Sequence, residues 1–498
     1  MTTPSPSTTP LRLRLATLLC PPLGLVLLWR TPQSVGRKLL GTLGVGLYGL
    51  LYTALILFLL HRFTGLRFEM QGRPIPVPTY TVTDFDKLER DRAQRSQAAA
   101  APLAPATNRA AYWTGFRGPN RDGHYTEQTL ALPWPASGPR LMWKQPIGGG
   151  YASFVIAGGL AFTSEQRRQH EVVTAYELET GREVWAHTYE ARFYESMGGE
   201  GPRATPAWHD GRVYAMGGTG ELRCLDAATG ALLWRHDVLK ENSSSGLFFG
   251  QSASPLIVDD QVIVLAGDGA APGAGTVIAY DRISGAVRWR AIEDKASYTA
   301  PMVVTLAGER QLLIVTGSRA LGLPLTGGQP LWSFPWRVEY DNAIAQPVVF
   351  ATNRFLLSAG YGTGAVGVEV SRTGSGFAAQ ELWRNKQLKN KFTCSVLWQG
   401  HAYGLDEDIL VCLDAATGER KWKDGRYGYG QVLLADGHLI ILCGNGDVAL
   451  VKASPERHEE LARIPAIKGK TWNHPALAHG RLLVRNAIEM ACFDLLAR

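Results

Sequence analysis

Two nearly identical stretches contain residues that could carry chemistry. "CLDAATGALLW" spans 224–234 and "CLDAATGERKW" spans 412–422. Each stretch places a thiol two residues before a carboxylate, which would suit a reactive site present twice. Each stretch is also typical of a turn, because an Asp side chain accepts hydrogen bonds from backbone N–H groups that follow it, and the Gly tolerates a positive φ. The tryptophan at the end is a large flat group that packs well between neighbouring elements.

The same turn recurs elsewhere without the cysteine. The core of the repeat is a strand, a turn of the type D-x-x-T-G and a second strand with Trp four residues after the Gly. Copies end at Trp185, Trp234, Trp289, Trp332 and Trp422, a looser copy ends at Trp383, and a unit near 450–464 has lost the Trp. Cys224, Cys412 and Cys492 stand where other copies have Ala175 and Ala279. We therefore interpret these cysteines, Asp226 and Asp414 as structural.

A second pattern of two short strands precedes each core. Four strands per unit, at a period of about 39–55 residues, are typical of a propeller blade. The last unit, 473–495, has three strands and no Trp strand, whereas "RLMWKQPI" at 140–147 is a Trp strand with nothing before it. Joining the two completes one blade from both ends of the array and removes free sheet edges. The sequence thus predicts an all-β, eight-bladed β-propeller closed by terminal strands, with the two CLDAATG copies opposite each other.

The N-terminal part predicts a membrane anchor. Residues 39–60 carry no charge over 22 positions, enough for a helix that spans the roughly 30 Å hydrocarbon core. The apolar run 15–29 is shorter and contains Pro21-Pro22, which favours a re-entrant or interfacial segment. We expect a membrane anchor over 1–67, a linker over 68–111 with a short exposed helix capped by Thr83 and Asp86, and the propeller over 112–498.

Charge argues for the same division. Residues 1–76 hold eight Lys and Arg and one acid, which accounts for the whole formal charge of +7, so 77–498 is balanced. A nucleic-acid partner is therefore not expected. Five basic residues precede position 39 and three follow position 60 before Pro74, a bias that predicts a cytoplasmic N-terminus and a propeller outside the cytoplasm. The six cysteines show no disulfide framework and no haem motif.

Candidate binding residues lie in the loops that join one blade's last strand to the next blade's first strand. These loops surround one mouth of the channel, where mixed charges and aromatic rings suit a small polar ligand or a peptide, although polar residues could equally fill a solvated channel. The candidates are Glu200, Arg203, Gln251, Tyr298, Tyr340, Asn342, Lys391, Arg426, Trp472 and His474.

Other motifs give weaker evidence of a function. "GKT" at 469–471 lacks the glycine that a phosphate loop needs at 464. "DED" at 406–408 is expected to be a solvated hairpin tip, and "NRDG" at 120–123 a turn rather than a calcium loop. The eleven histidines show no metal-ligand spacing, so we expect no metal site.

With its repeats laid out, the chain resembles the bacterial PQQ-like β-propeller repeat proteins. The resemblance covers about 112–498 and rests on "YWTGFRGPNRDG" (112–123), the unit at 201–234 and the segments at 433–486. It implies an eight-bladed fold in which the Trp docks one blade onto the next. The family includes quinoprotein alcohol dehydrogenases and a lipoprotein that assists outer-membrane protein assembly. Its dehydrogenases carry an adjacent cysteine pair at the quinone and a Glu/Asn/Asp set for calcium, which we do not find here.

Two functions follow from these observations. The first is a scaffold: a propeller anchored in the bacterial cytoplasmic membrane through 39–60, facing the periplasm and binding envelope proteins. The alternative is a dehydrogenase that uses PQQ and calcium to oxidise an alcohol or sugar. The sequence favours the binding module over the enzyme. We expect the arrangement of Glu200 and Asn342 at the mouth to discriminate between them.

Overall fold

The computed structural model describes residues 17–18, 20–64, 66–69, 77–80, 84–98, 110–135, 137–269, 275–374 and 376–496. The chain divides into two compact units, Met1–Phe68 with Pro78–Tyr80, and Glu69–Val77 with Thr81–Arg498. The expected cap residue Thr83 and parts of the segments 15–29 and 68–111 lie outside the described residues.

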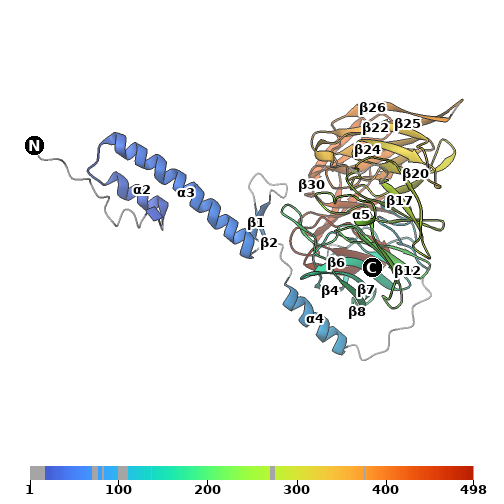
Figure 1. Ribbon diagram of the computed structural model, residues 1–498, viewed down its shortest axis with the longest axis horizontal. Coiled ribbons are helices and arrows are strands. Elements are labelled where there is room, and N and C mark those ends of the chain that lie inside the picture. The colour runs from blue at the N-terminus through green and yellow to red at the C-terminus, as the bar shows by residue number, and fades with distance from the viewer. Residues whose placement is uncertain are drawn as a thin grey trace, which may run out of the picture. The chain divides into compact units, whose positions relative to one another are not determined.

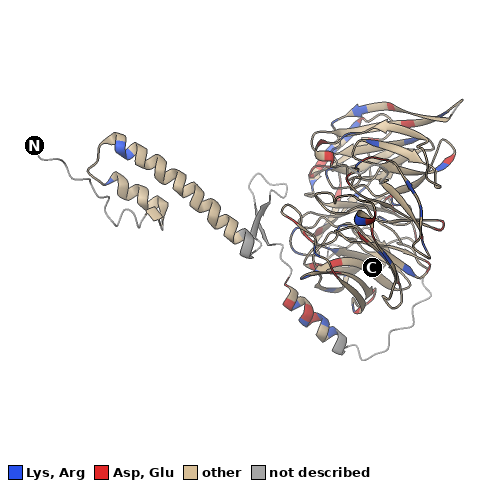
Figure 2. Ribbon diagram, viewed as in Figure 1, with Lys and Arg blue, Asp and Glu red and all other residues tan. Residues whose placement is uncertain are grey.

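The first unit is built on a long apolar helix. Helix α3 (Val35–Thr64) follows the short helix α2 (Pro21–Trp29), and β1 (Leu66–Glu69) pairs with β2 (Val77–Tyr80). Val35–Leu60 is long and apolar enough, by length and composition, to cross a membrane, and Figure 2 shows basic residues near the start of this segment. α2 packs back against α3: the Tyr48 hydroxyl donates to Leu18 O at 2.8 Å, and Leu28 lies against Gly41.

Eight sheets form the propeller of the second unit (Figure 1). The first blade consists of β5 (Val155–Ala157), β6 (Leu160–Arg167), β7 (His170–Glu177) and β8 (Glu183–Glu190), and the second of β11 (Ala207–His209), β12 (Arg212–Met216), β13 (Glu221–Asp226) and β14 (Leu232–Asp237). The third consists of β15 (Leu256–Val258), β16 (Gln261–Leu265), β17 (Val277–Asp281) and β18 (Val287–Ala291). The fourth consists of β19 (Met302–Leu306), β20 (Glu309–Val315), β21 (Arg319–Leu323) and β22 (Trp332–Pro335).

The remaining blades complete the ring. The fifth blade consists of β23 (Val348–Ala351), β24 (Arg354–Ala359), β25 (Gly364–Thr373) and β26 (Gly376–Asn385), and the sixth of β27 (Val396–Trp398), β28 (His401–Asp406), β29 (Ile409–Asp414) and β30 (Arg420–Arg426). The seventh consists of β31 (Gln431–Ala435), β32 (His438–Leu442), β33 (Asp447–Lys452) and β34 (Glu460–Pro465). The eighth consists of β35 (Ala476–Ala478), β36 (Arg481–Arg485), β37 (Glu489–Asp494) and β4 (Arg140–Pro146). Outside the blades lie α4 (Phe85–Ala98), β3 (His124–Tyr125), the short pair β9 (Tyr194–Glu195) and β10 (Gly199–Glu200), the helix α5 (Val238–Glu241) and a 3-10 turn (Glu339–Asp341).

The predicted fold class is confirmed, including the closure. β4 pairs antiparallel with β37, so the final blade takes three strands from the C-terminal end and one from the beginning of the array. The first strands of neighbouring blades contact each other and surround the central channel. Because the strands of a blade are antiparallel, the hairpins between second and third strands share a face with the blade-to-blade loops. We call this the loop face, and the opposite one the turn face.

The repeated turn and tryptophan dock several blades onto the next one. Trp185 packs on Gly230 of the following blade and donates its indole N–H to Ala227 O at 3.0 Å. Trp143 and Trp383 do the same with the following turns. In the seventh blade, Ala462 stands in the Trp register, opposite Leu450. The cysteines are structural as expected: Cys224 lies opposite Trp234 as Ala175 lies opposite Trp185, and burial raises the pKa of its thiol to about 11.

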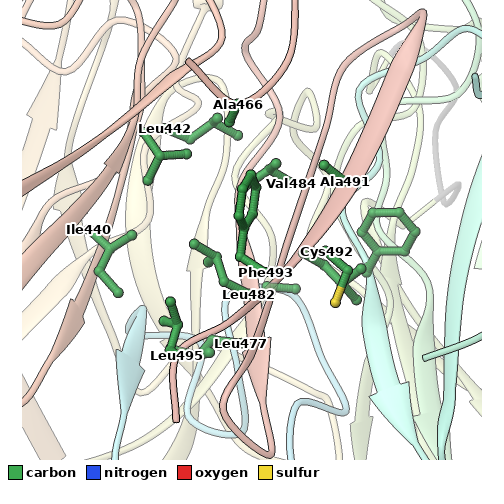
Figure 3. Packing of buried hydrophobic residues seen from close by; sticks show 14 of the residues in the cluster. Ile440, Leu442, Ala466, Leu477, Leu482, Val484, Ala491, Cys492, Phe493 and Leu495 are labelled. Carbon is green, nitrogen blue, oxygen red and sulfur yellow. The ribbon is translucent and has the colours of Figure 1, made fainter. Parts of the chain in front are cut away.

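Apolar residues fill the spaces between blades. Figure 3 shows the contact between the last two blades, where Ile440 and Leu442 of β32 face Leu482 and Val484 of β36 and Phe493 of β37, while Cys492 points to the other side of β37. All of these side chains are buried. The non-directional burial of these apolar surfaces holds together a ring whose blades share few backbone hydrogen bonds.

We expect Gly230→Ala to destabilise the propeller by about 2–4 kcal/mol. Gly230 has a φ of +73°, and an added Cβ would lie 2.6 Å from Trp185. Strain in the left-handed region costs about 1–3 kcal/mol, and the displaced indole adds to it. Gly211→Ala is the matched control, because Gly211 has a φ of +74° and open space around it. Urea denaturation of both variants should show the larger loss for Gly230, and equal losses would contradict the docking role.

The helix predicted as an exposed spacer is bound to the propeller. α4 is capped by Asp84, whose carboxylate accepts from Lys87 N at 2.9 Å. One stripe of α4 faces the junction of the first and last blades: Leu88 is buried, Arg92 pairs with Glu165 at 3.0 Å, and Arg95 donates to Lys144 O at 3.1 Å. The linker therefore contains a docked helix.

Candidate functional site

The channel is crossed by the chain's own lead-in, residues 112–125. Trp113 bridges Ile156 in the first strand of the first blade, and β3 pairs parallel with β31 of the seventh. Arg117 donates to Ser395 O at 2.8 Å. These contacts come from separate sides of the ring, so the lead-in occupies the centre of the channel.

A second arginine of the lead-in fixes it to two further blades. Arg121 is buried and donates to Ser254 O at 3.1 Å, to Pro301 O at 3.0 Å and to Pro255 O. Burial lowers the pKa of its guanidinium to about 9. Within "NRDG", Asp122 accepts from His124 N at 3.0 Å, so this segment is a turn, as expected.

Above the lead-in, rings and cations alternate around the loop-face mouth. Arg203 lies between two rings, 4.7 Å from Phe193 and 5.1 Å from Tyr151. Lys470 lies 5.6 Å from Tyr151 and 4.1 Å from Trp472. We call this set the cation–aromatic arc; its members are Phe193, Arg203, Tyr151, Lys470, Trp472, Phe392, Tyr429, Lys391, Tyr361 and Tyr340.

The arc continues without a break to the far side of the mouth. Phe392 lies 4.4 Å from Trp472 and 4.8 Å from Tyr429, ring centre to ring centre. Lys391 lies 5.2 Å from the rings of both Tyr429 and Tyr361. Tyr340, 72% exposed, follows at 5.7 Å from Tyr361. Such contacts contribute about 0.5–2 kcal/mol each and hold the rings in place for a partner.

Four of the ten predicted residues belong to the arc: Arg203, Tyr340, Lys391 and Trp472. Arg203 is anchored by Glu195 at 3.0 Å, and its burial lowers the pKa of the guanidinium. Glu200 lies beside the arc against Gly149, 3.9 Å from Arg192, and desolvation raises the pKa of its carboxyl group.

Four other predicted residues lie beneath the rim or within the channel. Tyr298 is buried and accepts from Phe249 N at 3.3 Å. Gln251 and Asn342 are also buried. Asn342 hydrogen-bonds with Tyr361, and in the part of the chain that the structure describes the Gln251 carboxamide nitrogen has no partner. His474 lies 4.9 Å from Phe116 of the lead-in. These residues support the mouth from below.

Arg426 does not join the mouth. It lies at the end of the outer strand β30 and pairs with Asp408. The "DED" segment also differs from the expectation of a solvated tip: Asp406 is 2% exposed because Lys389 and Lys423 both bind its carboxylate. The sequence did not reveal that Lys389, in the loop before β27, and Lys423, in the outer strand β30, would both bind this hairpin.

The pH dependence of stability should report on His474. Desolvation and the nearby Arg117 guanidinium hold the pKa of His474 well below its usual range. The unfolded chain therefore takes up a proton near pH 6.5 that the folded chain does not, and stability falls as pH drops below that value. We expect the wild type to lose up to about 1.4 kcal/mol per pH unit relative to His474→Gln between pH 6 and 5. Parallel urea titrations that show the same slope would contradict this assignment.

The mouth does not fit the calcium and PQQ of the dehydrogenases. Within the described residues, no group of three or more His, Cys, Asp or Glu side chains is placed to hold a metal ion. Glu200 and Asn342, the pair expected to discriminate, are bound to Arg192 and Tyr361, and no acidic partner joins them. All six cysteines are free thiols, and none is adjacent to another in the chain. We derive no reaction step through this cofactor.

The comparisons with known proteins place these features in context. A family model, PQQ_2, described as "Outer membrane protein assembly factor BamB", matches residues 169–424. BamB from Moraxella catarrhalis is 18% identical, with a TM-score of 0.51 over 71% of this chain and 97% of that one. The computationally designed Ika8 protein is 11% identical, with a TM-score of 0.51 over 72% of this chain and 100% of its own. Both likenesses show the fold alone.

A curated relative matches over a shorter stretch. The quinohemoprotein alcohol dehydrogenase of Comamonas testosteroni is 30% identical over 145 residues, which are 28% of this chain and 19% of the relative. The chain thus aligns with about a fifth of the length of that dehydrogenase.

Proposed function

The chain belongs to the PQQ_2 family described as outer membrane protein assembly factor BamB, and from that membership we propose that it is a protein-binding module of the cell envelope whose contact surface is the loop face. The observation that carries the proposal is the cation–aromatic arc. Rings that are fixed in place and partly exposed bind a partner at a low entropic cost, and aromatic residues and arginine dominate binding hot spots.

The rim around the arc supports the same function. Large apolar side chains stand exposed on the blade-to-blade loops: Tyr194 at 49%, Met197 at 59% and Phe248 at 62%. Acidic and basic residues are interspersed over the propeller (Figure 2), which suits a protein partner better than a polyanion.

We further propose that Val35–Leu60 anchors the propeller in the bacterial cytoplasmic membrane, with the propeller on the periplasmic side. The helix has the required length and hydropathy, and Arg30, Arg37 and Lys38 precede its apolar part, as the positive-inside rule requires of a cytoplasmic end. A module held at the membrane in this way would act on envelope proteins.

The dehydrogenase alternative is not favoured by any feature of the described mouth. Its support is the partial likeness to the Comamonas enzyme, whereas the donor groups of the mouth do not converge. Purified full chain incubated with PQQ and calcium should therefore show neither quinone absorbance nor dye-linked alcohol oxidation; both together would overturn the proposed function.

Site-specific photo-crosslinking tests the contact surface. We expect a photoreactive residue at Tyr340, on the loop face, to capture an envelope protein in intact cells. The matched control is Ile283, which is 48% exposed in a turn on the opposite face. The protein so identified should bind the Lys391→Glu variant about 10–100-fold more weakly than the wild type, because that change removes a central cation of the arc. Equal capture at both positions would contradict the proposal.

A further inference from the structure

The lead-in leaves one sector of the channel uncovered. Its hydrogen bonds and ring contacts reach every blade except the fifth, within the described residues. In that sector lies a cavity of about 360 Å³ between the lead-in and the first strands of the fourth, fifth and sixth blades. This volume lies at the lower end of the range for ligand sites.

The lead-in binds the first strands of three other blades through its carbonyl groups, which are the acceptors that this cavity lacks. Three of its carbonyl groups accept hydrogen bonds from first strands: Ile156 N, Trp208 N and Leu434 N donate to Trp113, Thr114 and Gly123, each at 2.8 Å. Each donor is the residue before the pair that closes a two-residue hairpin. At that position the N–H points away from the blade and toward the channel.

Two equivalent N–H groups line the cavity. Thr305 precedes the closing pair Leu306 and Glu309, and Leu397 precedes the closing pair Trp398 and His401. In the described part of the chain, no acceptor bonds either N–H. Unpaired strand edges are ready templates for another extended chain.

The side chains around the cavity define two walls. Val303, Val349 and Leu397 of the first strands form an apolar wall, and Asn120, Asp122 and His124 of the lead-in form a polar one. The titratable groups that line the cavity belong to Asp122 and His124. The guanidinium groups of Arg117 and Arg121 are bonded to backbone carbonyls.

We propose that this cavity binds an extended segment of a partner protein. The segment would make the same kind of backbone hydrogen bonds to the first strands as the lead-in does. The segment's carbonyl groups accept from the N–H groups of Thr305 and Leu397. Its side chains alternate: apolar ones lie on Val303, Val349 and Leu397, and a hydrogen-bond donor between them faces Asp122. Three residues span about 10 Å when extended. The site is independent of the cation–aromatic arc, so either proposal can fail alone.

The experiment uses the full chain in detergent and the probe acetyl-Val-Thr-Val-Lys-amide, labelled at the lysine. We expect saturable binding by fluorescence anisotropy. Hydrogen exchange at Thr305 and Leu397 should slow at least tenfold when the site is saturated. Absence of binding at millimolar peptide, or binding without protection of these two amides, would overturn the proposal. Slow exchange at both amides before peptide is added would also overturn it, because the chain itself would then fill the site.

Matched variants separate backbone from side-chain recognition. Thr305→Pro removes the N–H without removing a bond within the blade and should weaken binding at least tenfold. Thr305→Val keeps the N–H and should bind as the wild type does. Ile257→Pro makes the same change at the equivalent position of the third blade, outside the cavity, and should leave binding intact. Val349→Trp should abolish binding by filling the cavity, and equal binding by all four variants would refute the site.

Discussion

Replacing Trp113 with alanine should destabilise the propeller by about 3–5 kcal/mol. Trp113 is 1% exposed and belongs to the apolar cluster shared by the first, seventh and eighth blades. Its indole N–H has no partner among the described residues, so the change removes packing rather than a hydrogen bond. Large-to-small changes of buried aromatic residues cost about this much, since the transfer free energy is lost and a cavity remains.

The measurement is urea denaturation of the full chain, followed by tryptophan fluorescence. Tyr340→Ala is the control for loss of an aromatic ring, because Tyr340 is 72% exposed; it should change the free energy of unfolding by less than about 0.5 kcal/mol. A comparably small effect of Trp113→Ala would show that the lead-in contributes little to the ring.

Glu165→Leu should cost about 3–5 kcal/mol and release α4. The Glu165 carboxylate is fully buried and receives Arg167 at 2.6 Å, Arg92 of α4 at 3.0 Å and the Tyr176 hydroxyl at 2.7 Å. The cations around it hold the pKa of the carboxyl group far below its usual range, against the effect of burial. Arg92 and Arg167 also pair with Glu183, at 3.0 Å and 2.6 Å. Removing Glu165 leaves two buried guanidinium groups facing this one carboxylate, which is far more costly than losing an exposed pair.

Limited proteolysis and denaturation together test this prediction. In Glu165→Leu, cleavage within α4 should accelerate at least tenfold while the wild-type helix stays protected. Asp86→Ala is the control: its pair with Arg168 joins side chains that are 70% and 51% exposed, so its effect should stay below about 1 kcal/mol. Unchanged cleavage in the Glu165 variant would mean that α4 is held by other contacts.

The ring could be predicted from the sequence because the residues that define a blade lie close together in the chain and recur from blade to blade. Each D-x-x-T-G turn and its Trp specify one blade edge, so the spacing of Trp143, Trp185 and Trp234 reveals the period, and the mismatched ends reveal the closure. The structure confirms both and explains the conserved shape of the turn: Gly230 and Gly418 receive the indoles of the preceding blades. The CLDAATG copies lie in the second and sixth blades, opposite each other in a ring of eight.

The lead-in could not be placed from the sequence. Arg117 and Arg121 bind carbonyl groups 278 and 133 residues away. Hydrogen bonds to backbone carbonyls leave no trace in the residue types of the partner. Only the three-dimensional closure of the ring brings these carbonyls around the lead-in.

The candidate site was found in part. The choice of the blade-to-blade loops located the mouth, but six members of the arc were not among the predicted residues: Phe193, Tyr151, Lys470, Phe392, Tyr429 and Tyr361. One signal could have found three of them, because seven of the eight loops carry an aromatic residue near the start of the next blade. Arg426 was selected by its loop, yet it belongs to the outer strand, where side chains point away from the channel.

The most direct test of the account is the hydrogen exchange of three backbone amides. Ile156, Trp208 and Leu434 donate to the lead-in, and without it they would face an open channel. If the lead-in crosses the channel, all three should exchange as slowly as the amides inside the blades, and Trp113→Ala should accelerate all three together. Exchange at the rate of the exposed turns in the wild type would contradict a channel occupied by the chain itself.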